Sequence, residues 1–119
     1  MHIQFAELPV ADQDRAKAFY VEKLGCEVVA DAPMGGTWRW IEVRFPGAQT
    51  SLHFTRRTPD AERDEPVLVF VDSGVETTIE RLRAAGVEII TEPAAAPWQP
   101  GRIVAEFRDS EGNRMVIGT

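Results

Sequence analysis

Two stretches of this sequence leave a helix in the same way, and the repetition limits the folds open to the chain. "VEKLGCEVV" covers residues 21–29 and "LRAAGVEII" covers residues 82–90. In both, residues at helical spacing end at a glycine, Gly25 or Gly86, and a run typical of a β-strand follows. The period of about 60 residues is longer than that of most solenoid repeats. We therefore interpret the chain as a duplicated unit.

The first half is predicted to contain four strands and one helix. The strands cover 2–8, 26–31, 37–45 and 50–55, and the helix covers 10–25. Proline lacks a backbone N–H, so Pro9 is expected to end the first strand. Asp12 is the predicted N-cap of the helix.

The second half repeats this order of elements. Its strands are predicted at 66–71, 87–92, 102–108 and 113–118, and its helix at 73–86. Three prolines between residues 93 and 101 predict an irregular loop there.

The strand–helix–strand–strand–strand order, found twice, predicts an α+β fold. Two βαβββ modules would form a curved eight-stranded mixed sheet with the helices outside and a concave inner face. We expect one domain, 1–119, with module one at about 1–56, a polar linker at 57–65 and module two at about 66–119. The alternative is a ferredoxin-like βαββαβ sandwich, against which the additional pair of strands in each half argues.

Composition narrows the function classes. The formal net charge of −6 disfavours binding to nucleic acid or to anionic lipid. No apolar run is long enough to span a membrane, and the N-terminus shows no secretory signal, so a cytoplasmic location is expected. The single cysteine, Cys26, is interpreted as a small buried residue.

Three segments carry a resemblance to a known family: "PVADQDRAKAFYVEKLGCEVV", "GVETTIERLRAAGVEI" and "FRDSEGNRMVI". Together they resemble the vicinal oxygen chelate superfamily, which includes metal-dependent glyoxalases, extradiol dioxygenases, fosfomycin-resistance transferases and bleomycin-resistance proteins. The resemblance implies paired βαβββ modules, a cup-shaped site and a homodimer.

The resemblance also implies where a divalent metal would be held, on the first and last strand of each module. Those places fall on Phe5, on Ser51 with His53 two residues further, on Pro66 and on Val116. Phenylalanine, proline and valine side chains have no donor atom for a metal. We therefore expect no metal and no other cofactor; the alternative is one divalent ion held by Glu7 and His53, with His2 or Glu106 as further candidates.

Strand alternation, counted from Phe5, predicts which residues line the cup. The predicted ligand-binding residues are Phe5, Glu7, Trp38, Trp40, Glu42, His53, Phe70, Trp98 and Arg114. Tryptophan faces stack on flat ligands and attract cations, which together with two carboxylates favours a flat or cationic ligand. Trp38 and Trp40 could instead pack in a dimer interface, and the phase of Glu106 stays open.

Glu7 and His53 are the candidate catalytic residues. A carboxylate among apolar neighbours is a candidate proton-transfer group, although Glu7 could equally pair with Arg114 or another basic residue. His53 could act as a general base or lone metal ligand, or be a half-exposed strand residue.

The first functional hypothesis is a metal-free small-molecule binding protein, similar to the bleomycin-resistance branch. The second is an enzyme: a glyoxalase-like metal-dependent lyase or isomerase, or a dioxygenase, with a non-standard metal set. A structural or regulatory partner domain is the third. Whether the chain catalyses a reaction is left open.

Overall fold

A computed structural model describes residues 1–58 and 64–119 of this chain. The chain divides into two compact units, Met1–Glu62 and Arg63–Thr119, which we call module 1 and module 2. Part of the predicted linker, residues 59–63, lies outside the described residues. Each module contains four strands and helical structure, so the predicted α+β class is confirmed.

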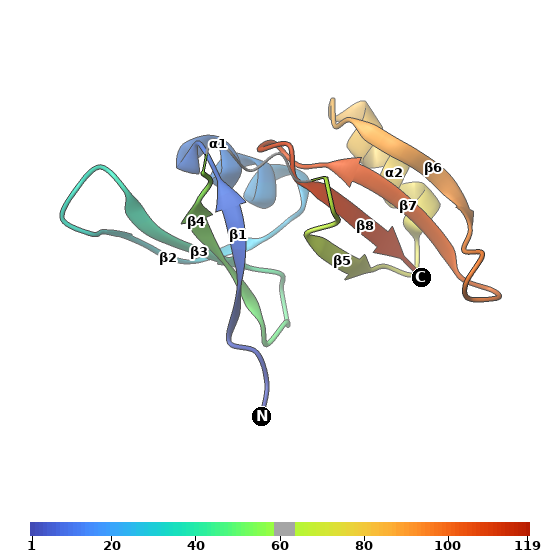
Figure 1. Ribbon diagram of the computed structural model, residues 1–119, viewed down its shortest axis with the longest axis horizontal. Helices are drawn as coiled ribbons and strands as arrows, with labels where there is room; N and C mark the ends of the chain where they lie inside the picture. The colour runs from blue at the N-terminus through green and yellow to red at the C-terminus, as the bar shows by residue number, and fades with distance from the viewer. Residues whose placement is uncertain (59–63) are drawn as a thin grey trace. The chain divides into compact units, whose positions relative to one another are not determined.

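Module 1 is a four-stranded mixed sheet with a helix packed on one face (Figure 1). Its elements are β1 (Phe5–Val10), α1 (Gln13–Ala18), η1 (Phe19–Lys23), β2 (Glu27–Pro33), β3 (Arg39–Arg44) and β4 (Ser51–Arg56). The strand order is β1-β4-β3-β2; β1 and β4 are parallel, and the other neighbours are antiparallel. The module therefore has the predicted βαβββ order.

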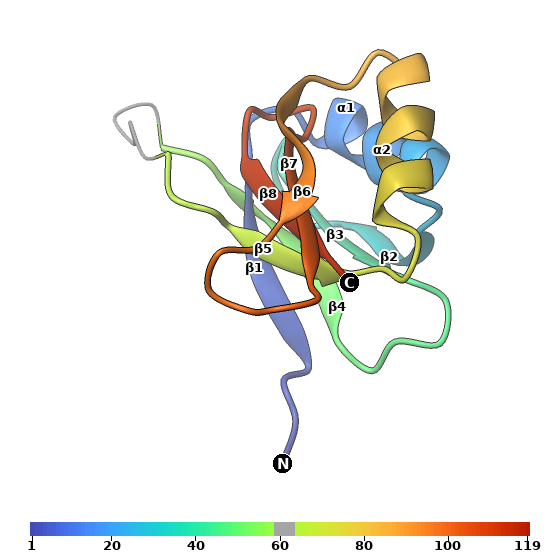
Figure 2. The same ribbon diagram turned by 90° about the vertical axis from the view of Figure 1, so that its right-hand side faces the viewer.

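Module 2 repeats this topology (Figure 2). Its elements are β5 (Leu68–Val71), α2 (Val75–Ala84), β6 (Ile89–Ala95), β7 (Ile103–Arg108) and β8 (Arg114–Gly118). The order is β5-β8-β7-β6, again with the first and last strands parallel. The eight strands thus form two hydrogen-bonded sheets of four, one in each module.

Two prolines lie inside strands rather than at their ends. The prediction that Pro9 ends the first strand is wrong, because β1 continues to Val10. The loop predicted from residue 93 begins later, because β6 runs through Pro93 to Ala95. Both strands are the outermost of their four-stranded sheets, where one side of the strand needs no partner and proline is tolerated.

The predicted helix at 10–25 is two elements. Asp12 is its N-cap, as predicted, and accepts a hydrogen bond from the backbone N–H of Arg15 at 3.0 Å. The chain then widens into the π-helical turn η1. A π-bulge accommodates an additional residue within a helix. The segment from Leu8 to Gly25 is correspondingly one residue longer in sequence than the segment from Phe70 to Gly86 in module 2.

Apolar residues on one side of each sheet form the core with the helices. In module 1 they include Leu8, Val10, Tyr20, Ile41, Val43 and Phe54. In module 2 they include Val75, Ile79, Leu82, Ala105, Phe107, Met115 and Ile117. Each sheet therefore has a second face that turns away from its helix and is available for function.

The turn that joins β7 to β8 is built around one carboxylate. Asp109 accepts hydrogen bonds from the backbone N–H groups of Glu111 and Asn113, both at 2.9 Å. Gly112 has a φ of 80°, a conformation that glycine adopts without strain. This turn sets the register of the final strand and hence the position of its outward side chains.

Among the described residues, no helix has both the length and the apolar character needed to cross a membrane. Cys26 is 4% exposed, as predicted, and burial raises the pKa of its thiol to about 12.

Candidate functional site

The outward face of the module 1 sheet carries a compact group of aromatic and polar side chains. We call it the histidine cluster; it comprises Phe5, Glu7, Trp40, Glu42, Ser51 and His53. The strand register brings Glu7 of β1 and Glu42 of β3 to either side of His53 on β4. Their alternating neighbours Leu8, Val43 and Phe54 point into the core. Strand alternation therefore predicted this group correctly.

His53 lies at the centre of the cluster. Its ring stacks on the indole of Trp40 with centroids 3.8 Å apart, and the edge of Phe5 approaches at 5.4 Å. Nδ1 lies 2.8 Å from a carboxylate oxygen of Glu7. Nε2 is buried and has no hydrogen-bond partner among the described residues.

The contact with Glu7 fixes the orientation of the imidazole ring. With the proton on Nδ1 donated to Glu7, Nε2 keeps a lone pair, which is the arrangement of a general base or a hydrogen-bond acceptor. Of the alternatives that the sequence left open for Glu7, the structure contains the pairing with a basic residue, and that residue is His53. The side chain of Glu7 is 54% exposed, so it is not the buried carboxylate among apolar neighbours that the sequence suggested.

Glu42 is held inside the cluster by two donors. The hydroxyl of Ser51 donates to one of its carboxylate oxygens at 2.6 Å, and the Trp40 indole N–H approaches the other at 3.4 Å. Both carboxylates of the cluster are therefore already occupied by neighbouring side chains.

Trp38 lies apart from the cluster. It precedes β3, and its ring lies under the guanidinium carbon of Arg56 at 4.7 Å, a cation–π contact. It also lines a shallow hollow at the start of α1 with Asp12 and Gln13. The structure brings Trp40 but not Trp38 to His53.

Module 2 has a pocket of about 440 Å³ on the outward side of its sheet. Apolar residues dominate its lining: Pro66, Val69, Trp98, Val104, Ala105 and Val116. Three polar residues, Thr91, Arg102 and Glu106, complete it. A pocket of this volume, mostly apolar with few polar groups, has the usual make-up of a small-molecule site.

Glu106 and Arg114 form the strongest ion pair at this pocket. Arg114 Nε and Nη2 donate to the two oxygens of the Glu106 carboxylate at 2.6 and 3.0 Å. The Thr91 hydroxyl donates to the same carboxylate at 2.8 Å. Chiefly through the hydrogen bonds from Arg114, the pKa of the Glu106 carboxyl is held below its usual value. The sequence left undecided which side of the sheet Glu106 faces; in the structure it faces outward.

The predicted face of Phe70 is wrong. Parallel pairing matches Phe70 with Ile117, and its ring stacks on buried Phe107 with centroids 6.0 Å apart. Val69, matched with Val116, faces the pocket instead. Pro66 precedes the strand, so alternation cannot be counted through it. Trp98, predicted as a lip, lines the pocket and is 67% exposed.

Arg102 was missed by the sequence analysis. Its guanidinium packs directly over Gly118, where a Cβ would lie 2.7 Å from Arg102 Nε. Arg102 Nε is buried without a hydrogen-bond partner among the described residues, and Nη1 donates to Gln99 at 3.2 Å. Gly118 in the last strand was the available signal, because a glycine inside a strand often marks a place where another group packs closely against the backbone.

The residues at the four implied metal places do not fit a metal ion. Phe5, Pro66 and Val116 have no donor atoms, and the Ser51 hydroxyl is engaged by Glu42. Across residues 1–58 and 64–119, no three His, Cys, Asp or Glu side chains are arranged to hold a metal. His2 lies exposed in the segment before β1, and Glu106 is bound by Arg114.

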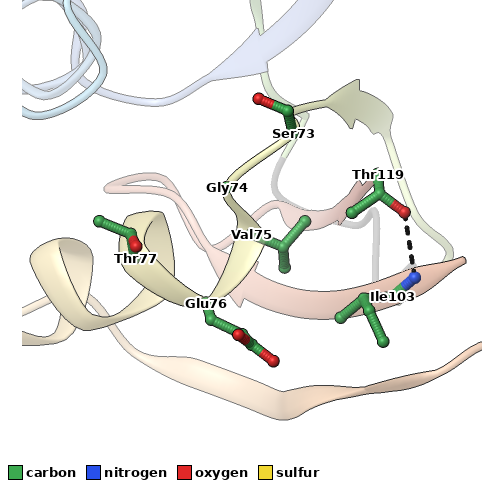
Figure 3. Close-up of a pocket in the computed structure, with 7 residues that line it drawn as sticks. All are labelled: Ser73, Gly74, Val75, Glu76, Thr77, Ile103 and Thr119. Carbon is green, nitrogen blue, oxygen red and sulfur yellow. Dashed lines mark hydrogen bonds between the residues drawn. The ribbon is translucent and has the colours of Figure 1, made fainter.

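A smaller pocket of about 130 Å³ lies at the start of α2 (Figure 3). It is lined by Gly74, Glu76 and Thr119, whose hydroxyl accepts a hydrogen bond from the backbone N–H of Ile103. Asp72 already supplies a carboxylate here, accepting from Gly74 N–H at 2.8 Å and from the Thr78 hydroxyl. These bonds fix the turn that leads into α2, whose N-cap residue is Gly74.

The chain is similar to several known proteins over nearly its whole length. The model of the "Glyoxalase/Bleomycin resistance protein/Dioxygenase superfamily" matches residues 2–117. The uncharacterized protein YetH of Bacillus subtilis (strain 168) is 36% identical over 110 residues, which cover 91% of this chain and 89% of YetH.

Two solved structures are similar in both sequence and fold. TnmS3, described as an antibiotic binding protein from Streptomyces sp. CB03234, is 36% identical with a TM-score of 0.79, covering 99% of this chain and 93% of TnmS3. UcmS2 is 33% identical with a TM-score of 0.81, covering 99% and 97%.

Proposed function

We propose that this chain, which belongs to the glyoxalase/bleomycin resistance protein/dioxygenase superfamily, is a metal-free binding protein for a flat small molecule. The observation that carries the proposal is the module 2 pocket, whose volume of about 440 Å³ suits a polycyclic ligand. The antibiotic-binding description of TnmS3 supports the same class of function.

The contacts within the pocket explain how such a ligand would be held. Valine and proline side chains offer an apolar floor, and burying apolar surface there contributes about 25 cal/mol per Å². Trp98, exposed at the pocket, offers a ring face for stacking. No covalent step is needed for a protein that only sequesters its ligand.

The metal-dependent lyase, isomerase or dioxygenase is the weaker hypothesis. It needs a set of metal-binding donor atoms, which the positions implied by the family resemblance lack. Glu7 and His53, the other candidate ligands, already bond to each other. A divalent ion bound in stoichiometric amount, and lost in His53→Ala, would favour the enzyme over the binding protein. Elemental analysis of the purified protein measures this directly.

The test of the proposed function is direct binding. A panel of neutral flat polycyclic compounds, titrated into chelator-treated protein, is expected to quench tryptophan fluorescence saturably. Val116→Asp, which places a carboxylate in the apolar lining, should weaken binding at least tenfold, while the exposed control Val29→Asp should not. Mass spectrometry should recover the compound unchanged. Absence of binding across the panel, or conversion of the compound, would contradict the proposal.

Two further expectations belong to this proposal. The family resemblance implies a homodimer, which sedimentation analysis of the purified protein would measure. A cytoplasmic location is also proposed, and fractionation of the native host would test it.

A further inference from the structure

The carboxylates on the outward faces of the two sheets already have hydrogen-bond partners. Glu7 bonds to His53, Glu42 to Ser51, and Glu106 to Arg114 and Thr91. A flat cation would therefore meet carboxylates that already have partners. This weakens the sequence-based expectation of a cationic ligand, which relied on Glu7 and Glu42.

Arg102 is in the opposite situation. Among the described residues it forms no ion pair, and its one side-chain partner is the neutral amide of Gln99. Its Nε is buried and unpaired. Arginine presents donors in a planar fork that matches a carboxylate, so a guanidinium without an ion-pair partner in an apolar pocket is a binding site for an anionic group.

The position of Arg102 is fixed by the fold. Strand β8 offers Gly118 opposite Val104, and the absence of a side chain there gives the guanidinium its place over the sheet. Trp98 and Val116 line the same pocket, so a ring and a cation border one space. An apolar wall, an exposed indole and an unpaired cation together match an aromatic acid.

Building on the proposed function, we propose that the module 2 pocket selects flat aromatic molecules that carry a carboxylate, with Arg102 binding the acid group and Trp98 covering the ring. The acidic net charge of the chain repels anions in general, which makes a local, shielded cation the means of selecting them. The same charge rules out a broad basic surface as the source of any such preference.

The test uses two probes of the same shape, 2-naphthoate and its neutral analogue 2-naphthamide, titrated into the full chain by calorimetry. Naphthoate should bind at least about tenfold more tightly, because its carboxylate accepts charge-assisted hydrogen bonds from the guanidinium. Arg102→Gln should remove this preference and leave naphthamide affinity within about twofold. Arg102→Lys should keep only part of it, because lysine lacks the fork.

Gly118→Ala is an independent variant, because its methyl group would displace the guanidinium without changing the charge. It should reduce the acid preference as Arg102→Gln does. Arg83→Gln on α2 is the matched control: it removes one exposed positive charge outside the pocket and should change nothing. Circular dichroism verifies that each variant is folded.

Several results would overturn the inference. They are equal binding of the two probes, a preference that survives in Arg102→Gln, an equal loss of preference in Arg83→Gln, or no binding of either probe at millimolar concentration. The proposed function fails separately, since it depends on the neutral polycyclic panel. A protein that binds the panel but ignores the acid group keeps the first proposal and loses the second.

Discussion

Modules 1 and 2 have the same strand order, but the side chains on the outward faces of their sheets differ. The β1–β4 pair presents Phe5, Glu7 and His53, which contact one another closely. The β5–β8 pair presents Val69 and Val116, which leave a pocket between bulkier neighbours. A duplicated backbone thus supports a filled polar–aromatic surface in one module and an open apolar one in the other.

The difference shows that topology positions a site without deciding its chemistry. In module 1 both carboxylates bond to neighbouring side chains, while His53 Nε2 is buried without a hydrogen-bond partner among the described residues. In module 2 the ion pair of Arg114 with Glu106 borders the pocket, and Arg102, which forms no ion pair among the described residues, is left to meet a ligand. The histidine cluster and the pocket of about 440 Å³ are therefore in different modules.

The largest effects are expected where the modules are alike, in their cores. Phe54→Ala and Phe107→Ala each remove a fully buried ring and should lower the free energy of unfolding by about 3–5 kcal/mol. Urea denaturation followed by circular dichroism measures both. A loss below about 1 kcal/mol in only one module would break the equivalence of the two cores.

The filled surface of module 1 should tolerate truncation less well than an exposed site. Glu42→Ala removes the nearer acceptor of the buried Ser51 hydroxyl, leaving the Gln4 carbonyl at 3.3 Å, and should cost about 1–3 kcal/mol of unfolding free energy. Glu80→Ala, on the exposed side of α2, is the control and should stay within about 0.5 kcal/mol. Equal effects of both changes on the urea midpoint would show that the cluster contributes nothing to stability.

The helix starts of the two modules differ in a way that pH can reveal. The pKa of the Asp72 carboxyl is lowered, first by the Thr78 hydroxyl and then by Gly74 N–H. Its folded-state pKa lies below the unfolded value, so its contribution is present above the unfolded pKa and is lost as pH falls through the folded one. Asp72→Asn weakens these hydrogen bonds and should therefore cost about 0.5–1.5 kcal/mol at pH 7 and progressively less in acid.

Thermal melts of both proteins over a pH series from neutral to strongly acidic measure this difference. Thr78→Val, which removes one donor to Asp72, should show a smaller version of the same pH dependence. A difference between wild type and Asp72→Asn that is constant with pH would contradict the assigned cause.

The smallest effect is expected at the Glu7–His53 contact. Because Glu7 is 54% exposed, Glu7→Gln should change the free energy of unfolding by no more than about 1 kcal/mol. Urea denaturation is again the measurement. A loss above about 2 kcal/mol would mean that this contact, rather than the buried Glu42 side of the cluster, holds the module 1 surface together.

Much of the fold was readable from local patterns. The two glycine-terminated helix exits predicted the duplication, and alternation in "TWRWIEVRF" and "TSLHFT" predicted which side of β3 and β4 faces the core. Trp40, Glu42 and His53 were therefore assigned to one face correctly. Period-2 alternation carries this information because one face of each strand is buried.

In module 2 the face of Phe70 was predicted wrongly, because the strand sequence shows no alternation of polar and apolar residues. "VLVF" is apolar at every position, so its alternation cannot be read, and only the pairing of β5 with β8 placed half-buried Phe70 on the core side against Phe107 and Val69 at the pocket. Pro9 and Pro93 were read as strand ends, because a sequence does not reveal which strands lie at an edge.

By itself, then, the sequence determined the order of the elements, the buried faces of the alternating strands and the lack of donor atoms at the implied metal places. Tertiary structure alone decided the strand register and what lies across from each residue: Glu7 beside His53, Glu106 beside Arg114, and Arg102 over Gly118. The physical reason is range. Periodicity records the burial of each segment locally, whereas these contacts join residues that only the pairing of distant strands brings together.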